Sequence, residues 1–216
     1  MRVLQFNCWF ADEGYAWETR APAMRAWIAH LKPDVICLQE VLRGLQTDGQ
    51  PVDMLADLFR GTEYTHQIYG RASEFFFARA PAKHPLSVGN AIVSRWPITS
   101  HEIRPLPRFE DPTPRPTQPS RTSTDVGRSA TWAQIQSPHG PISICCTHLN
   151  SMAQHGHNRL DQAVEVMSLI NSKESLPASW CPVRSCGATT AALSRGFPAS
   201  HCCHLHVLYI PHTLLF

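Results

Sequence analysis

Apolar runs and periodic spacing at the start of the chain predict a strand, a helix and a second strand. Residues 2–10 are mostly apolar but are interrupted by Asn7, a residue type that is uncommon in strands. Residues 19–31 carry apolar side chains at helical spacing. The expected apolar face of this helix comprises Met24, Trp27, Ile28 and Leu31. Residues 35–38 form an unbroken apolar run, as in a strand covered on both faces, and this run stops at Glu40. We therefore expect an α/β unit whose two strands end on polar groups.

The rest of the chain, as far as residue 173, predicts further strands and helices. Strands are expected over residues 64–69, 75–78, 91–93, 127–135 and 142–148, and helices over 53–59 and 155–172. Gly89 and Asn90 predict a turn or bulge before one strand. Residues 137–140 predict a hairpin turn between the last two strands. The later helix is expected to bury Ala163, Val166, Met167 and Ile170. The proline-rich residues 105–122 predict an extended loop.

Composition narrows the class of protein. The 216 residues suffice for one domain with a sizeable core, and 43% hydrophobic content is ordinary for a globular chain. A formal charge of +2 is too small to indicate nucleic-acid binding by itself. No segment approaches the ~20 apolar residues of a membrane helix, so we expect no transmembrane segment. Cys37, Cys145 and Cys146 lie inside apolar runs, which predicts buried thiols and a reducing, cytoplasmic setting. No feature indicates a protein partner.

Two motifs in the predicted α/β unit resemble the start of the endonuclease/exonuclease/phosphatase superfamily. They are Phe6-Asn7-Cys8-Trp9 and the run from Pro33 to Val41 that contains Glu40. The resemblance implies the deoxyribonuclease-I-like fold, an α/β sandwich of two facing mixed sheets with helices outside. It also implies hydrolysis of a phosphodiester or phosphomonoester with magnesium or manganese. In the superfamily the two matching residues help to hold the cation, so Glu40 and Asn7 are the expected metal ligands, and Asn7 is also expected to assist catalysis. A solvated glutamate at the start of a loop is the alternative for Glu40.

A third motif, Thr147-His148-Leu149, resembles the superfamily's next conserved segment. The resemblance implies that His148 contacts the scissile phosphate or protonates the leaving group, although a lone histidine at a strand end is more often structural. The resemblance also assigns Asn90, Arg128 and Asn150 to substrate binding. The substrate would be a phosphate ester of a nucleic acid, a lipid or a small molecule.

The chain departs from the superfamily pattern beyond residue 173. The Asp-x-Asn motif that orients the nucleophilic water and the final Asp-His pair are both missing, and residues 175–216 contain no Asp, Glu or Lys. We therefore expect a partial domain over residues 1–173, with an incomplete second sheet, and a disordered, Cys/His-rich tail over residues 174–216. Activity should be impaired. The alternative function is a non-catalytic remnant or splice form that acts, if at all, as a binding module.

A second interpretation of the tail is zinc binding. Thiolate and imidazole ligands would come from Cys181, Cys186, Cys202, Cys203, His204 and His206. The spacing of these residues matches neither a common zinc finger nor a zinc ribbon. Equimolar zinc in protein purified without added metal would support this interpretation.

The abrupt change of composition near Leu176 suggests a changed reading frame, a retained intron or an alternative exon. If this hypothesis holds, sequencing of the transcript across this point will show an altered junction. A continuous, correctly spliced message that encodes the same tail would refute a gene-model error.

Overall fold

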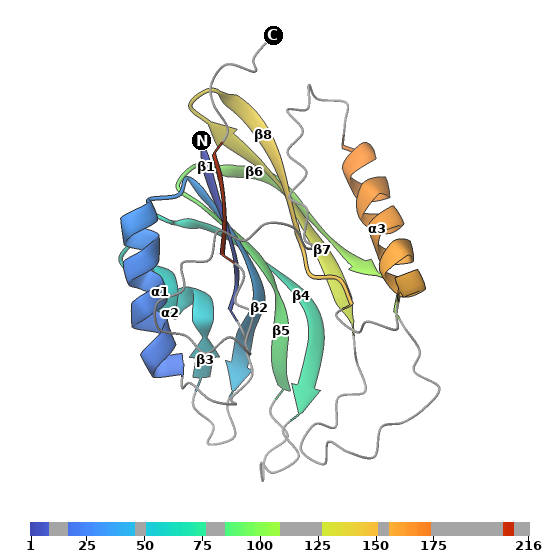
Figure 1. The fold of residues 1–216 in the computed structure, drawn as a ribbon, viewed down its shortest axis with the longest axis horizontal. Helices are drawn as coiled ribbons and strands as arrows, with labels where there is room; N and C mark the ends of the chain where they lie inside the picture. Colours follow the sequence, from blue (N-terminus) through green and yellow to red (C-terminus); the bar gives the residue numbers. More distant parts are fainter. Residues whose placement is uncertain are drawn as a thin grey trace.

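The protein, seen here as a computed structural model, forms two β-sheets flanked by helices (Figure 1). The structure describes residues 1–8, 17–45, 51–76, 85–108, 127–150, 156–173 and 205–209. The helices are α1 (Trp17–Leu31), α2 (Met54–Phe59) and α3 (Gly156–Asn171). The strands are β1 (Arg2–Asn7), β2 (Val35–Leu45), β3 (Pro51–Asp53), β4 (His66–Phe76), β5 (Pro85–Ser94), β6 (Ile98–Leu106), β7 (Arg128–Ser137), β8 (Gly140–Thr147) and β9 (Leu205–Tyr209).

The larger sheet has the strand order β4-β5-β2-β1-β9, and β3 pairs with β2 outside this path. β1 and β2 run parallel, with Asn7 paired to Gln39, and α1 forms the connection between them. The expected α/β unit is therefore confirmed. The smaller sheet has three described strands in the order β6-β7-β8, and β7 and β8 form the predicted hairpin.

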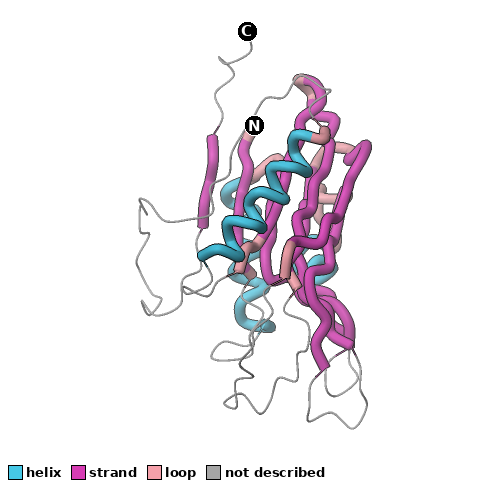
Figure 2. The backbone as a smooth tube through the Cα atoms, turned by 90° about the vertical axis from the view of Figure 1, so that its right-hand side faces the viewer, coloured by secondary structure: helices cyan, strands magenta, loops and turns pink. Residues whose placement is uncertain are grey.

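Three hydrophobic clusters separate four layers. α1 and α2 pack on one face of the larger sheet through the cluster that contains Met24, Leu38 and Leu58. The other face packs against the smaller sheet, and α3 covers the outside of that sheet through Leu169. Figure 2 shows α3 running in front of the strands. This arrangement confirms the two-sheet α/β sandwich with helices outside, and the second sheet has only three strands in the part that the structure describes.

β2 does not end near Glu40, as the apolar run had indicated. It continues to Leu45, and Glu40 lies inside it, at a break in the register of the β2–β5 pair between Leu38 and Val41. The prediction was wrong about the strand end because polar residues inside a β-bulge look, in sequence, like the start of a loop.

Gly89 and Asn90 lie inside β5 rather than in a turn before it. A Cβ atom at Gly89 would lie 2.2 Å from the carbonyl oxygen of Gly70 in β4, so glycine is required here by the close approach of two strands. β4 itself is one strand, His66–Phe76, where two were expected. Its own register breaks between Arg71 and Ser73, next to Gly89.

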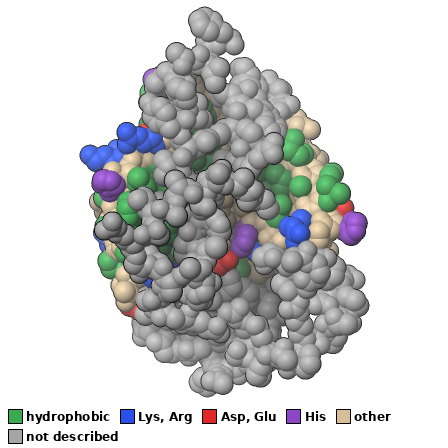
Figure 3. All heavy atoms as spheres, in the orientation of Figure 1, with side chains coloured by type: hydrophobic (Ala, Val, Ile, Leu, Met, Phe, Trp, Pro, Cys, Tyr) green, Lys and Arg blue, Asp and Glu red, His purple; other side chains and the backbone are tan. Residues whose placement is uncertain are grey.

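The helices bury faces that differ in part from the predicted ones. In α1, Met24 and Ile28 are buried as expected, but Trp27 is 45% exposed. In α3 the buried residues are Asn158, Gln162 and Leu169. Three apolar side chains of α3 face outward instead: Leu160, Val164 and Met167. Figure 3 shows hydrophobic side chains at the surface on the α3 side of the molecule.

Part of the predicted tail belongs to the larger sheet. β9 pairs antiparallel with β1, and Figure 1 shows the two strands side by side. The other residues of the tail and most of the predicted proline-rich loop lie outside the described residues, so disorder of the tail stays a prediction. The loop begins later than expected, because β6 extends to Leu106. None of the described helices is long and apolar enough to cross a membrane.

The contact between Gly89 and Gly70 yields a stability test. Gly89→Ala should lower the free energy of unfolding by roughly 2 kcal/mol or more, because the new methyl group collides with backbone that cannot move aside. Gly156→Ala is the matched control, since its Cβ would meet nothing closer than 3.9 Å. Urea denaturation of both variants measures the difference, and equal stabilities would contradict the close packing of β4 and β5.

Candidate active site

Asn7 is the last residue of β1 and faces the space between the two sheets. Side chains alternate along a strand, and Val3, four residues earlier, belongs to the core between the sheets. The parallel pairing of Asn7 with Gln39 brings the amide beside the next residue of β2. Nδ2 of Asn7 donates a hydrogen bond to Oε1 of Glu40 over 3.1 Å. The structure thus joins the first two predicted site residues.

A β-bulge directs Glu40 toward the smaller sheet. Leu38 and Val41 both belong to the core under α1 and α2, although they are three positions apart, so one extra residue lies between them. Glu40 occupies the left-handed region with φ of 56°, which is uncommon for any residue other than glycine. Its side chain is 17% exposed and reaches His148 of the smaller sheet. Strained backbone of this kind is typical of functional sites.

His148 follows the last residue of β8 and lies between an acid and a cation. Its Nδ1 is 3.8 Å from Oε1 of Glu40 and 3.1 Å from a terminal nitrogen of Arg128. Burial, reinforced by the positive charge of Arg128, lowers the pKa of His148 to about 4. The imidazole is therefore neutral at pH 7, and its approach to Glu40 is not an ion pair.

Arg128 is the first residue of β7, and its guanidinium group is largely buried beside the site. Burial lowers the pKa of Arg128, and the carboxylate of Glu40 opposes that shift. Arginine nevertheless stays charged in proteins. Its Nε is buried, and none of the described groups accepts a hydrogen bond from it. A desolvated cation with an unused donor is suited to an anionic ligand.

The other two residues assigned to substrate binding contact protein groups. Asn90 is buried in β5, and its Nδ2 donates to the carbonyl oxygen of Ser129 over 2.8 Å. Asn150 is buried after β8, and its Nδ2 donates to Oδ1 of Asn158 over 3.1 Å. These bonds support the segments that carry Arg128 and His148, and a direct role in substrate binding stays a prediction for both residues.

An amide network on α3 holds the segment after His148, and sequence reasoning did not foresee it. Oε1 of Gln162 accepts from the backbone nitrogen of Asn150, over 2.9 Å. Gln162 and Asn158 both donate to the carbonyl oxygen of Pro107, at the end of β6. The sequence did contain one signal: Asn158 and Gln162 are four residues apart and therefore lie on the same face of the helix.

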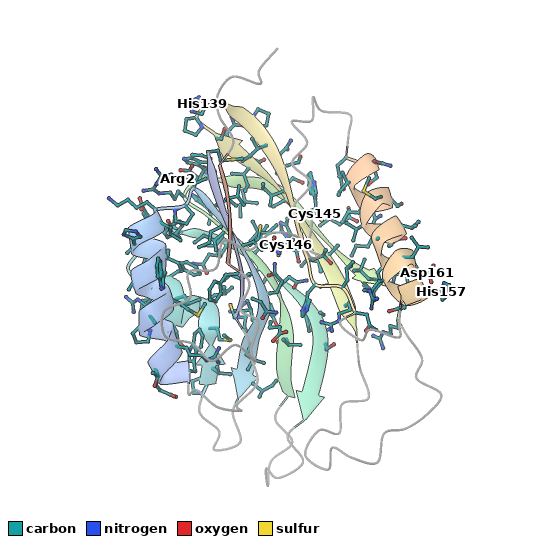
Figure 4. The ribbon with its side chains drawn as sticks, viewed as in Figure 1. Arg2, His139, Cys145, Cys146, His157 and Asp161 are labelled. Carbon is teal, nitrogen blue, oxygen red and sulfur yellow. The ribbon has the colours of Figure 1, made fainter. Side chains whose placement is uncertain are left out.

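The donor set at Glu40 and Asn7 fits a hard divalent cation. A carboxylate and an amide oxygen suit magnesium, which is commonly bound by one or two carboxylates, water and substrate phosphate. Among the described residues no group of three or more His, Cys, Asp and Glu side chains could hold a metal ion, so a site built from protein ligands alone is not found there. His157, at the start of α3, lies near Asp161 at the exposed surface of that helix (Figure 4). The proposed zinc ligands of the tail lie outside the residues whose side chains are described.

Residues 4–176 match the Endonuclease/Exonuclease/phosphatase family. Among solved structures, an endonuclease/exonuclease/phosphatase from Beutenbergia cavernae DSM 12333 is similar over 77% of this chain and 43% of its own, with 25% identity and a TM-score of 0.60. TDP2 of D. rerio, solved with a single-strand DNA product, has 16% identity and a TM-score of 0.51 over 80% of this chain and 55% of its own. The human nocturnin catalytic domain, solved with a sulfate anion, has 16% identity and a TM-score of 0.50 over 80% of this chain and 58% of its own.

The chain thus spans between about two fifths and three fifths of the length of these three structures. Their low identities to this chain, two of them well under 25%, mean that the likeness to TDP2 and nocturnin concerns the fold alone. None of the curated protein sequences matches the chain.

The lowered pKa of His148 predicts a pH-dependent stability of the metal-free protein. The unfolded histidine takes up a proton near its ordinary pKa of 6.5, whereas the folded one does so only near 4. Stability from this group is therefore complete above pH 6.5 and is lost as the pH falls toward 4, by roughly 2–3 kcal/mol. Denaturant unfolding in chelator at several pH values should show this slope in the wild type and a shallower one in His148→Gln. Equal slopes would contradict the burial of a neutral imidazole.

Proposed function

The chain belongs to the endonuclease/exonuclease/phosphatase family, and we propose that it hydrolyses phosphate esters with a divalent cation, magnesium or manganese, held at Glu40. One observation carries the proposal. Asn7, Glu40, Arg128 and His148 come from segments far apart in sequence, yet contacts of 3.1 to 3.8 Å join them in one chain of polar groups. Such a chain of polar groups, partly withdrawn from water, is costly without a function.

Each residue of the site has a role that its chemistry permits. Glu40 would hold the cation through its carboxylate, and Asn7 orients that carboxylate by donating to Oε1. When bound, the cation polarises the phosphoryl group and activates water. Arg128 supplies a buried positive charge to the phosphoryl oxygens. His148 is neutral and can donate a hydrogen bond to the substrate from the nitrogen that faces away from Arg128.

Turnover is expected to be weak. Residues 174–216, which follow the proposed domain, contain neither an Asp-x-Asn motif nor an Asp-His pair. Loss of a group that orients the attacking water costs roughly 10²–10⁴ in rate. This observation favours a second candidate function, in which the chain binds a phosphate ester without hydrolysing it.

We propose a reducing compartment such as the cytoplasm. Cys145 and Cys146 are adjacent thiols in β8 that form no disulfide. Burial raises the pKa of Cys145 to about 12, which keeps its thiol protonated and unreactive. Free thiols, one of them buried and the other partly buried, are typical of proteins that do not depend on oxidative folding.

Glu40→Ala separates the two candidate functions. With magnesium and bis(para-nitrophenyl) phosphate, the wild type should release para-nitrophenolate, and the variant should lose at least roughly 10²-fold in rate because it lacks the proposed cation ligand. Glu63→Ala is the matched control. Glu63 is an exposed acid that pairs with Arg95, the residue that directly follows β5. Neither residue belongs to the proposed site, so the loss of Glu63 should leave turnover unchanged.

A binding measurement completes the comparison. Magnesium should raise the melting temperature of the wild type and of Glu63→Ala but not of Glu40→Ala, because only a ligand that binds the native state stabilises it. Substrate binding without turnover in the wild type would favour the binding module. A magnesium response retained in Glu40→Ala would contradict the proposed cation site.

A further inference from the structure

Arg128 and His148 meet through their side chains, and the chemistry of this contact fixes the state of the histidine. A terminal nitrogen of Arg128 lies 3.1 Å from Nδ1 of His148. A guanidinium group has five N–H donors and no acceptor. Nδ1 must therefore present its lone pair to Arg128, and the single proton of the neutral ring must lie on Nε2.

We propose that Arg128 is a positioning residue that holds His148 in the Nε2-protonated tautomer, so that His148 donates a hydrogen bond to a phosphoryl oxygen instead of protonating the leaving group. The hydrogen bond to a phosphoryl oxygen rests on the proposed hydrolytic function, whereas the assignment of the tautomer rests only on the contact between Arg128 and His148. The positioning role adds to the charge that Arg128 offers the phosphoryl oxygens, because the contact with His148 uses a terminal nitrogen and leaves Nε unused.

The backbone around Arg128 is held from three neighbouring strands. The carbonyl oxygen of Gly127 accepts from Ser73 of β4 over 2.8 Å. The carbonyl oxygen of Ser129 accepts from Asn90 of β5 over 2.8 Å and from Thr147 of β8 over 3.0 Å. The carbonyl oxygens of both residues next to Arg128 are thus held by hydrogen bonds, which restricts the backbone position from which its side chain extends.

His148 is fixed by the same network. It directly follows Thr147, which pairs with Ala130 in the β7–β8 hairpin. On its other side, the backbone nitrogen of Asn150 is held by Gln162. Arg128 thus begins β7, and His148 directly follows the adjacent, hydrogen-bonded strand β8, so both side chains extend from backbone held by the hairpin.

Glu40 is the competing partner for Nδ1, and the distances decide between the two. If Nδ1 carried a proton, it would donate to Oε1 of Glu40, but that separation is 3.8 Å and too long for a hydrogen bond. The same proton would point at the donors of Arg128, only 3.1 Å away. Arg128 therefore determines the tautomer.

The role of His148 follows from this tautomer. A general acid would need protons on both nitrogens before it could give one to the leaving oxygen. The doubly protonated ring would set a donor and a positive charge against Arg128. A neutral Nε2–H group can still stabilise negative charge on a phosphoryl oxygen, without transferring its proton.

Nitrogen NMR of the metal-free protein tests the tautomer without any need for turnover. In protein labelled with ¹⁵N-histidine at pH 7, we expect His148 to show a proton-bearing Nε2 and a lone-pair Nδ1. The signal is identified by its loss in His148→Gln, which separates it from the other eleven of the twelve histidines. A proton on Nδ1, or on both nitrogens, would overturn the proposal.

Two arginine variants test the cause. Arg128→Met keeps an unbranched side chain without the donors and should shift the His148 signals toward a mixture of tautomers. Arg95→Met removes an arginine that pairs with Asp34 and Glu63 just after β5 ends and should leave the signals unchanged. An unchanged tautomer in folded Arg128→Met would refute the positioning role. If Arg128→Met does not fold, Arg128→Gln takes its place, since its side-chain amide has both a donor and an acceptor and so does not fix the tautomer.

The leaving group tests the role in catalysis. His148→Ala should lose the same factor, about 10²- to 10³-fold, on an alkyl ester and on a para-nitrophenyl ester of the same phosphate. A smaller loss on the para-nitrophenyl ester, whose leaving group needs no proton, would overturn the donor role. Absence of turnover on every ester, together with the expected tautomer, would refute the proposed hydrolytic function and retain the assignment of Arg128.

Discussion

One extra residue in β2 is the constraint on which the site depends. A regular strand would continue the alternation of Ile36 and Leu38 and direct Glu40 into the apolar layer under α1 and α2. The bulge restores that layer with Val41 and turns the carboxylate toward the smaller sheet. The left-handed backbone at Glu40 costs about 1–3 kcal/mol, which the well-packed strands on either side must offset. The bulge thus serves both packing and chemistry.

The charges of the side chains around Glu40 compensate one another, and these side chains are mostly shielded from water. Arg128 is cationic, Glu40 is anionic, and His148 is neutral because burial and the nearby guanidinium both oppose its protonation. The described side chains at the center therefore carry no net charge. A divalent cation would give the site an excess of two positive charges, which equals the charge of a fully ionised phosphomonoester and exceeds the single negative charge of a phosphodiester. Such a site would bind its anion well only when the cation is present.

Sequence reasoning predicted the β1–α1–β2 unit and the β7–β8 hairpin, because the buried runs of β2 and β8 and the spacing in α1 are local patterns, whereas the two-sheet sandwich was expected from the resemblance of the motifs to the superfamily. It also named all four polar groups that meet at the site, three of them by motif. It could not foresee the bulge at Glu40, since the polar residues of a bulge resemble a loop. It likewise missed the buried amides of α3, because Asn158 and Gln162 fit that face only through a partner, the carbonyl of Pro107, that is distant in sequence. Contacts of this kind depend on long-range geometry.

The pairing of β9 with β1 has a consequence for biosynthesis. Arg2 pairs with Tyr209, so one edge of β1 gains its partner only after about two hundred further residues have been translated. At roughly 5–20 residues per second, this takes on the order of 10–40 s on the ribosome. During that time the nascent chain has an open strand edge beside its central pair, where other chains could add. Chaperone demand in the cell would then depend on the rate of elongation as much as on the final stability.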